Sequence, residues 1–215
     1  MEATDRLTPD RTAPPPSETR TATFGLGCFW GPDARFGSMT GVVRTRVGYA
    51  GGTAADPTYY SLGDHTEVVQ VEYAPADLDY TDLLEVCWRS HDPFSAAHKR
   101  QYRGVILVHD DDQLAAAERS RDALADRTGK SVQTPIETLG EFTLAEDSHQ
   151  KYELRSTPVL GDELLDHYGE ALVDSTVAAR LNGFVAGHGD PDQREAFLAG
   201  LDLPPSVLAE VERRL

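Results

Sequence analysis

The sequence predicts an α/β (α+β) fold: a two-layer sandwich with a mixed sheet and a ferredoxin-like core, followed by a helical C-terminal extension. Segments with the two-residue alternation of strands and segments with helical spacing follow one another through residues 22–142. From residue 158 onward the chain changes to short helical segments punctuated by Gly and Pro. The 215 residues, 40% of them hydrophobic, are enough to bury one sizeable core.

The first half of the chain supplies three strands and one helix. Residues 22–26 form an apolar strand, and a helix begins at the turn that contains Cys28 and runs through Phe36. Residues 42–49 alternate well enough for a half-buried strand, and residues 66–73 alternate most clearly of all. Residues 51–64, which lie between these two strands, are rich in turn-forming residues and are expected to form a loop.

A second helix begins after Asp79, which is its expected N-cap, and Asp82 completes a capping box three positions on. This helix runs to about Ser90 and ends before His91-Asp92-Pro93, which we interpret as a helix stop rather than a catalytic dyad. Beyond it the pattern predicts a buried strand over residues 103–108, a surface helix over 113–127 and a further strand over 136–142. The extension is expected to contain helices over residues 162–168, 174–184, 191–201 and 205–215.

The chain is expected to have three parts. Residues 1–20 are polar and include Pro14-Pro15-Pro16, which predicts a flexible N-terminal tail. Residues 21–157 form the α/β domain, and residues 158–215 form the helical extension.

The net charge of −16 argues against nucleic acid and anionic membranes as partners. Only three lysines occur, Lys99, Lys130 and Lys151, so arginine supplies the other 17 basic residues. An excess of acidic residues with scarce lysine predicts an acidic protein adapted to high salt, as in a halophile. A GC-rich genome is the alternative, but it would explain only the scarcity of lysine.

The chain contains two cysteines, Cys28 and Cys87, which is too few for a disulfide framework or a zinc-ligand spacing. The first twenty residues lack the apolar core of a signal peptide, and no apolar run is long enough to span a membrane. We therefore expect a cytoplasmic monomer that works without a metal or cofactor.

Cys28 is the candidate nucleophile, because it lies in the run Gly27-Cys28-Phe29-Trp30-Gly31 at the junction of a strand and a helix. Unpaired backbone N–H groups and the positive end of the helix dipole stabilise a thiolate over a thiol at such a position. The two aromatic side chains are expected to form a pocket wall. A dinucleotide-binding turn is the competing interpretation, but Phe29 and Trp30 would obstruct the pyrophosphate.

Seven motifs follow one another in a fixed order along the chain. They are Gly27-Cys28-Phe29-Trp30-Gly31, Gly48-Tyr49-Ala50-Gly51-Gly52, Pro57-Thr58-Tyr59, His65-Thr66-Glu67-Val68-Val69, His91-Asp92-Pro93, Gln101-Tyr102-Arg103 and Ala145-Glu146-Asp147-Ser148-His149-Gln150. Together they resemble the peptide methionine sulfoxide reductase A family over roughly residues 21–156. Seven motifs in order are far more specific than any one of them.

The resemblance implies an oxidoreductase that reduces methionine (S)-S-oxide with thiols, in proteins and as the free amino acid, and so repairs oxidative damage. It makes Cys28 the nucleophile that becomes a sulfenic acid, and Glu67 the acid that protonates the sulfoxide oxygen. A carboxyl group donates a proton near neutral pH only when burial raises its pKa, so we expect Glu67 to be buried.

The resemblance also implies a set of substrate-binding residues. Phe29 and Trp30 would hold the S-methyl group by apolar contact. Tyr59 and Tyr102 would donate hydrogen bonds to the developing oxyanion. The adjacent Tyr60 is the alternative to Tyr59, and a plain strand-edge position is the alternative for Tyr102.

Two features depart from the family pattern. The position five residues before Tyr102, which is often acidic, is Ala97 here, so a hydrogen-bond partner is missing unless His98 replaces it. The loop between Tyr59 and His65 is shorter than usual, which bears on substrate breadth. Further along, Asp147 and His149 are as well placed to support the site as to contact substrate.

No cysteine follows Cys87, whereas many relatives carry a resolving cysteine in a Gly-rich tail. The spacing of Cys87 from other apolar residues predicts a buried position, with resolution of Cys28 as the alternative. We therefore expect an external reductant, either a thioredoxin-like protein or a small thiol. The extension is expected to cover a sheet edge or the back of the core; docking of the reductant or a second subunit is the alternative.

Two other functions compete with this interpretation. A reductase of another small methyl sulfoxide would fit the shortened loops. A weakly catalytic redox sensor or sulfoxide-binding protein would fit Ala97 and the missing resolving cysteine, but a sensor needs the thiol and not Glu67.

Overall fold

The computed structural model describes residues 7–201 together with residues 209, 211 and 213. Its centre is one sheet with the strand order β5-β4-β1-β3-β2-β6. The strands are β1 (Arg20–Leu26), β2 (Val42–Ala50), β3 (Thr66–Tyr73), β4 (Gly104–Val108), β5 (Ile136–Thr138) and β6 (Phe142–Leu144). Only β4 and β5 pair in parallel; the other neighbours in this sheet are antiparallel, so the predicted mixed sheet is confirmed.

The ferredoxin-like core is confirmed by the connectivity of the first four strands. With α2 (Trp30–Gly37) and α3 (Tyr80–Arg89) they follow one another as β1-α2-β2-β3-α3-β4 and lie in the order β4-β1-β3-β2. Antiparallel pairing joins the end of one strand to the start of the next: Leu26 pairs with Gly104, and Tyr49 with Glu67. The ends of β1 and β2 and the starts of β3 and β4 therefore lie at one end of the sheet.

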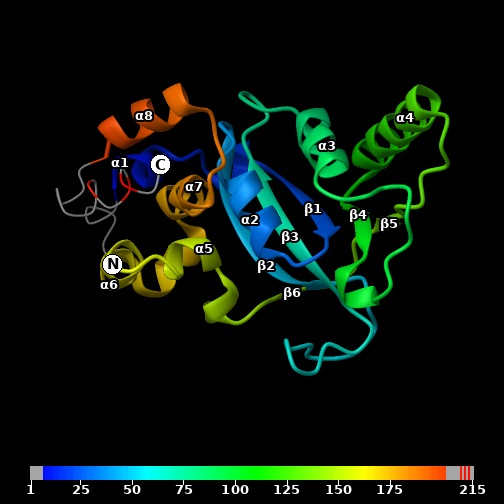
Figure 1. Ribbon diagram of the computed structural model, residues 1–215, viewed down its shortest axis with the longest axis horizontal. Coiled ribbons are helices and arrows are strands. Elements are labelled where there is room, and N and C mark those ends of the chain that lie inside the picture. Colours follow the sequence, from blue (N-terminus) through cyan, green and yellow to red (C-terminus); the bar gives the residue numbers. More distant parts are fainter. Residues whose placement is uncertain (1–6, 202–208, 210, 212, 214–215) are drawn as a thin grey trace.

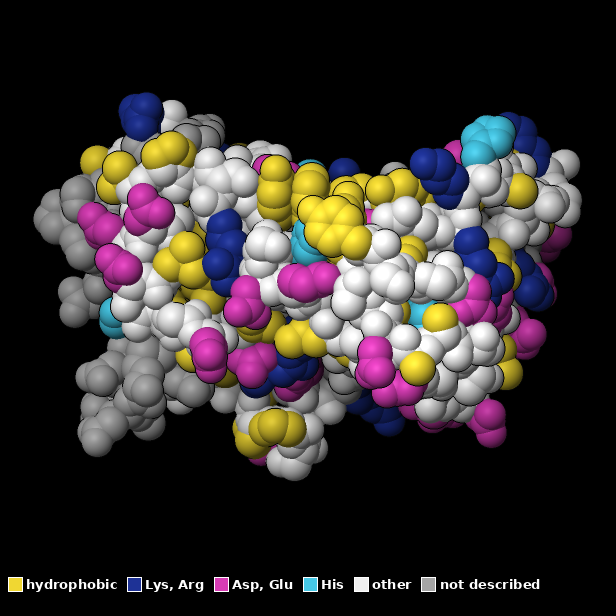
Figure 2. Space-filling view, turned by 90° about the horizontal axis from the view of Figure 1, so that it is seen from below, with side chains coloured by type: hydrophobic (Ala, Val, Ile, Leu, Met, Phe, Trp, Pro, Cys, Tyr) yellow, Lys and Arg dark blue, Asp and Glu magenta, His cyan; other side chains and the backbone are white. Residues whose placement is uncertain are grey.

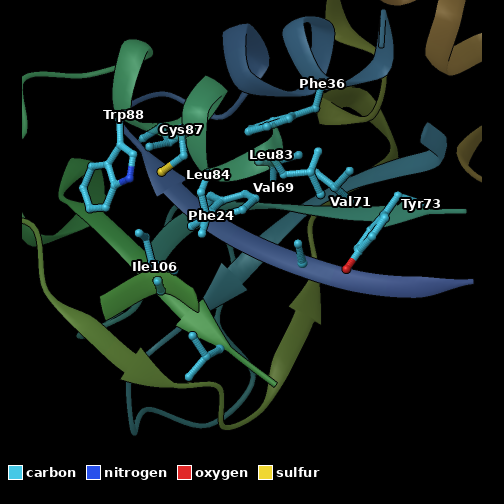
Figure 3. Packing of buried hydrophobic residues seen from close by; sticks show 14 of the residues in the cluster. Phe24, Phe36, Val69, Val71, Tyr73, Leu83, Leu84, Cys87, Trp88 and Ile106 are labelled. Carbon is cyan, nitrogen blue, oxygen red and sulfur yellow. The ribbon is translucent and has the colours of Figure 1, made fainter. Parts of the chain in front are cut away.

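The main core lies between the sheet and helices α2, α3 and α4 (Asp111–Thr128) (Figure 3). Phe24 stacks on Phe36 of α2, with 5.2 Å between ring centroids. Cys87 of α3 is completely buried in this cluster, as its helical spacing predicts. The predicted capping box of α3 is confirmed as well, because the Asp79 and Asp82 side chains each bind the other's backbone N–H.

The single strand predicted over residues 136–142 is wrong. β5 pairs with β4 at one edge of the sheet, whereas β6 pairs with β2 at the other edge. Leu139, between the two strands, and Phe142, the first residue of β6, pack on the second face of the sheet. The Phe142 ring lies against Gly48, where the Cβ of any other residue would collide with it, so glycine at position 48 lets this ring pack on the sheet.

Short helices gather beside α2 in a second cluster with its own core (Figure 1). They are α1 (Thr8–Thr12), α5 (Tyr152–Arg155), α6 (Leu160–Tyr168), α7 (Thr176–Val185) and α8 (Pro191–Ala199). The chain also forms 3-10 turns at η2 (Pro16–Glu18), η3 (Arg100–Tyr102), η4 (Asp147–His149) and η5 (Gly169–Asp174). The helix predicted over 205–215 lies outside the described residues, apart from 209, 211 and 213.

α7 packs directly against α2, with backbone touching backbone. A Cβ at Gly37 would collide with the carbonyl oxygen of Ala179, and one at Gly183 with that of Ala34. α7 also contacts β2. This part of the extension therefore covers the outer side of the helix that follows Cys28.

Residues 7–20, which belong to the segment predicted as a flexible tail, contain α1 and η2 and contact the extension. Asp10 of α1 accepts hydrogen bonds from the backbone N–H groups of Thr176 and Val177, at 2.5 and 3.2 Å, and from the hydroxyls of Ser175 and Tyr168. The carboxylate thus caps the start of α7, a partner that a local view of a polar, Pro-rich segment cannot reveal. Residues 1–6 lie outside the described part of the chain.

Candidate active site

Cys28 lies in the turn between β1 and α2, and its side chain is exposed. Gly27 has a φ of +90°, which only glycine adopts readily, so the chain turns sharply just before the thiol. Burial of the sulfur raises the pKa of Cys28, the backbone N–H of Trp30 lowers it, and the carboxylates of Glu67 and Glu153 raise it further. The pKa is raised overall, so the resting group is a thiol. The backbone N–H at the helix N-terminus favours the thiolate, as expected, but burial of the sulfur outweighs it.

Glu67 is the second residue of β3, the strand that pairs with β1. Its side chain is buried, with 1% exposed, so its predicted burial is confirmed. One carboxylate oxygen accepts a hydrogen bond from the Gln101 side chain at 2.7 Å, and the other accepts the backbone N–H of Phe29 at 3.2 Å. Burial raises the pKa of Glu67 more than these two hydrogen bonds lower it. A carboxyl group with a raised pKa is therefore joined through one backbone N–H to the residue that follows Cys28.

An apolar wall stands beside the thiol. Phe29 is buried against Tyr49, whereas Trp30 is half-buried and stacks on Tyr152 with 3.6 Å between ring centroids and 4° between ring planes. The Trp30 indole N–H donates to Nδ1 of His149 at 3.3 Å. These contacts fix both aromatic rings, as a binding wall for a small apolar group requires.

The structure brings Tyr59, and not Tyr60, to this wall. Tyr60 is 96% exposed, whereas Tyr59 is half-buried and contacts His149 with 4.6 Å between ring centroids. Glu146 holds the loop in place, because its carboxylate accepts the Tyr59 backbone N–H at 3.0 Å and the Tyr49 hydroxyl at 2.7 Å.

Tyr102 reaches the same site from η3. Burial, then Glu67 and Tyr59, and to a smaller extent Cys28, raise the pKa of Tyr102 to about 12. Its hydroxyl therefore keeps its proton and remains a hydrogen-bond donor at neutral pH.

Sequence reasoning missed three contributors to this site: Gln101 beside Glu67, Glu146 behind Tyr59, and Tyr152 on Trp30. Gln101 and Glu146 each lie inside one of the seven motifs, and this position alone could have indicated that they belong to the site. Tyr152 lies outside the quoted motifs and left no signal. His149 contacts Phe29, Trp30 and Tyr59, whereas Asp147 is exposed.

Two other motif residues point elsewhere. His91 bonds with the Cys87 carbonyl and the Thr134 hydroxyl, which is a structural position and not a dyad with Asp92. Ala97 and His98 are exposed, and Ala97 lines a separate cavity on the far side of Arg100. The hydrogen-bond partner that Glu67 has here is Gln101.

Within the described residues, no group of three or more His, Cys, Asp and Glu side chains is arranged to hold a metal ion. None of the helices formed by these residues is long and apolar enough to cross a membrane.

Comparison with known proteins points to one family. A profile described as "Peptide methionine sulfoxide reductase" matches residues 20–165. The "Peptide methionine sulfoxide reductase" of Drosophila melanogaster is 39% identical over 188 residues, which is 86% of this chain and 76% of that protein. The "Peptide methionine sulfoxide reductase A5" of rice, Oryza sativa, is 40% identical over 86% of this chain and 75% of its own length.

Solved structures agree with the sequence comparison. Mxr1 from Saccharomyces cerevisiae in reduced form aligns with a TM-score of 0.63 and 26% identity, over 67% of this chain and 89% of the yeast chain. Methionine sulfoxide reductase A of Corynebacterium diphtheriae aligns with a TM-score of 0.59 and 29% identity, over 69% of this chain and 80% of that one. An exposed thiol, a buried carboxyl group and an aromatic wall thus lie on a matching fold, and the chain belongs to the peptide methionine sulfoxide reductase family.

Proposed function

We propose that this chain reduces the S epimer of methionine sulfoxide, in proteins and as the free amino acid, through a sulfenic acid on Cys28. The observation that carries the proposal is the pairing of Cys28 with Glu67. A buried carboxyl group with a raised pKa next to an exposed thiol supplies both an acid and a nucleophile.

The reaction balances without any group beyond these two. Glu67 gives its proton to the sulfoxide oxygen, Cys28 attacks the sulfoxide sulfur, and the thiol proton replaces the one that Glu67 lost. The oxygen passes to Sγ of Cys28, and the methionine thioether is released. One thiol and one sulfoxide thereby become one sulfenic acid and one thioether.

The aromatic residues select and polarise the substrate. Phe29 and Trp30 hold the S-methyl group by apolar contact, because both rings are fixed by their neighbours. Tyr59 and Tyr102 donate hydrogen bonds to the oxygen as negative charge develops on it. The raised pKa of Tyr102 suits this role, since a phenolate could not donate.

An external thiol returns the sulfenic acid to the thiol. The first thiol forms a mixed disulfide with Cys28 and releases water, and a second thiol then releases Cys28. Cys87 does not fit the resolving role, because its sulfur lies within the main core, where burial raises its pKa. We propose a thioredoxin-like protein or a small cellular thiol as the reductant of a cytoplasmic monomer.

Single turnover in the absence of reductant tests this function. Each separated epimer of a methionine sulfoxide peptide is mixed in excess with the enzyme, and methionine is counted. We expect one methionine per enzyme from the S epimer and none from the R epimer, together with one sulfenic acid detected by a dimedone-type probe.

Variants assign the two cysteines. Cys28→Ser should form no methionine, whereas Cys87→Ala should turn over at close to the wild-type rate with a dithiol. Alanine is chosen at position 87 because a serine hydroxyl would be buried without a partner. Product from the R epimer, or product from Cys28→Ser, would refute the proposal; a reactive Cys28 without product from either epimer would favour the redox sensor.

A further inference from the structure

A cavity of about 290 Å³ lies at η3, next to the start of β4 and the segment that precedes β5. Ala97, Arg100, Arg103, Gln133 and Thr134 are among the residues that line it, and none of its lining residues is acidic. Arg100 lines the cavity, whereas the next two residues, Gln101 and Tyr102, belong to the active site.

The chain around this cavity differs in charge from the rest of the molecule. The net charge is −16, yet residues 93–109 and 127–136, which supply the cavity lining, contain no Asp or Glu. Of the three lysines, Lys151 is buried, and the two exposed ones both lie here. Lys99 precedes Arg100, and the Lys130 ammonium lies 5.0 Å from the ring centroid of Phe94, next to the lining residue Ser95.

Nearby carboxylates balance only part of this positive charge. Glu137 binds the Arg103 guanidinium through two hydrogen bonds at 2.6 and 2.7 Å. Asp92 interacts with Lys130. The Arg100 guanidinium donates hydrogen bonds to the backbone carbonyls of Gly51 and Asp64, and the Glu137 carboxylate also interacts with its charge. Figure 2 shows Lys and Arg side chains together with Asp and Glu side chains at the end of the molecule at which Figure 1 draws α4 and β5.

We propose that this cavity, which is lined by Arg100 and Arg103 and has the exposed Lys99 and Lys130 in its flanking segments, binds an acidic residue of the protein substrate close to its methionine sulfoxide. The inference rests on the proposed function, because it assumes that a peptide occupies the site. An extended peptide advances about 3.3 Å per residue, so a carboxylate two to four positions from the sulfoxide lies about 7–13 Å from it along the peptide. The enzyme therefore prefers sulfoxides with Asp or Glu neighbours over those with Lys neighbours.

Single-turnover rates on two matched peptides test this preference. Each peptide carries one methionine S-sulfoxide. The three residues on either side of it are Glu in one peptide and Lys in the other. We expect kcat/KM for the Glu peptide to exceed that for the Lys peptide by about tenfold at 0.1 M salt. The ratio should fall toward one at 1 M salt, where the Debye length is about 3 Å.

Charge reversal locates the effect. In the double variant Lys99→Glu and Lys130→Glu, the ratio should fall at least fivefold, whereas Arg119→Glu on exposed α4 should leave it unchanged. Lys99 and Lys130 are exposed, so neither substitution disturbs the core. Far-ultraviolet circular dichroism checks that each variant is folded.

Each outcome separates this inference from the proposed function. Equal rates on the two peptides, or a ratio that Arg119→Glu lowers as much as the double variant does, would overturn the basic cavity while leaving the reductase activity established. A charge effect that is seen only during turnover with a thioredoxin would assign the patch to the reductant and would also overturn it. Failure to reduce either peptide would refute the proposed function itself.

Discussion

At the scale of single residues, the chemistry depends on the proton of Glu67. Replacing it by glutamine in Glu67→Gln keeps the shape and removes the acid. The single-turnover rate at neutral pH should fall about 100- to 10,000-fold, the usual contribution of a positioned acid. Glu141→Gln, the same change at an exposed position, should have no effect. Rapid-quench measurement of the methionine formed gives both rates. A decrease of less than tenfold in the rate of Glu67→Gln would show that Glu67 is not the acid.

The pH dependence of the single-turnover rate also tests whether Glu67 acts as the acid. The pKa of Glu67 is raised above its ordinary value of 4.5, so the carboxyl group keeps its proton to higher pH than an exposed glutamate does. The wild-type rate should decline as pH rises through that pKa. The pKa of Cys28 is raised above 9.0, so the rate of Glu67→Gln should instead increase with pH as the thiolate forms. Parallel profiles for the two proteins would contradict this assignment.

Two neighbouring tyrosines offer an internal comparison. Tyr59→Phe removes a hydroxyl at the aromatic wall, whereas Tyr60→Phe removes one from a side chain that is 96% exposed. We expect kcat/KM to fall at least tenfold for the first and to stay within twofold for the second. Steady-state rates with a dithiol suffice. A larger effect at Tyr60 would show that the loop adopts another register when substrate binds.

The site residues differ in how far the sequence could specify them. Cys28, Glu67 and Tyr59 lie in motifs whose order defines the family, so their proximity could be predicted. The protonation state of Cys28 could not, because its pKa depends first on burial of the sulfur and then on the carboxylates of Glu67 and Glu153, which the folded chain brings close. Gln101 lies in a recognised motif, but its partner could not be read from that motif, because its hydrogen bond to Glu67 joins η3 to β3.

At the scale of elements, alternation and capping signals identified most strands and helices, and failures occurred where the partner is distant. The segment over 136–142 reads as one strand locally, yet its two ends pair at opposite edges of the sheet. The N-terminal segment reads as a tail, yet one carboxylate joins it to α7. Neither partner lies within the window that a periodicity argument covers.

The cap of α7 leads to a prediction at this scale. Asp10→Ala removes four hydrogen bonds, two of them to backbone N–H groups that lie at the start of a helix. The free energy of unfolding should fall by about 1–2 kcal/mol, as for other N-caps. Asp126→Ala on exposed α4 is the control. Urea titrations measure both, and equal effects would show that α1 contributes nothing to the fold.

At the scale of the whole molecule, one buried network joins the α/β domain to the extension. Lys151 is fully buried, and its ammonium group donates to the Asp33 carboxylate at 3.2 Å and to the Thr45 carbonyl at 2.6 Å. The same carboxylate accepts hydrogen bonds from the Asn182 side chain of α7 and from the Thr45 hydroxyl. Asp33 lies on α2, so the helix that follows Cys28 is held by β2, by the α5 segment and by α7. We propose that residues 21–157 and 158–201 unfold together and not as separable units.

Breaking this network tests the proposal. Lys151→Met keeps the length of the side chain but leaves the Asp33 carboxylate buried without its cation, which costs about 3–5 kcal/mol in the free energy of unfolding. Adding Asp33→Asn removes the stranded charge, so the double variant should recover part of that loss. The exposed pair of Arg89 and Glu85 gives the contrast, because Arg89→Met should cost less than 1 kcal/mol. Urea unfolding followed by circular dichroism and by tryptophan fluorescence should show one transition for the wild type. Two separated transitions, or equal costs for Lys151→Met and Arg89→Met, would mean that the extension folds independently of the helix it covers.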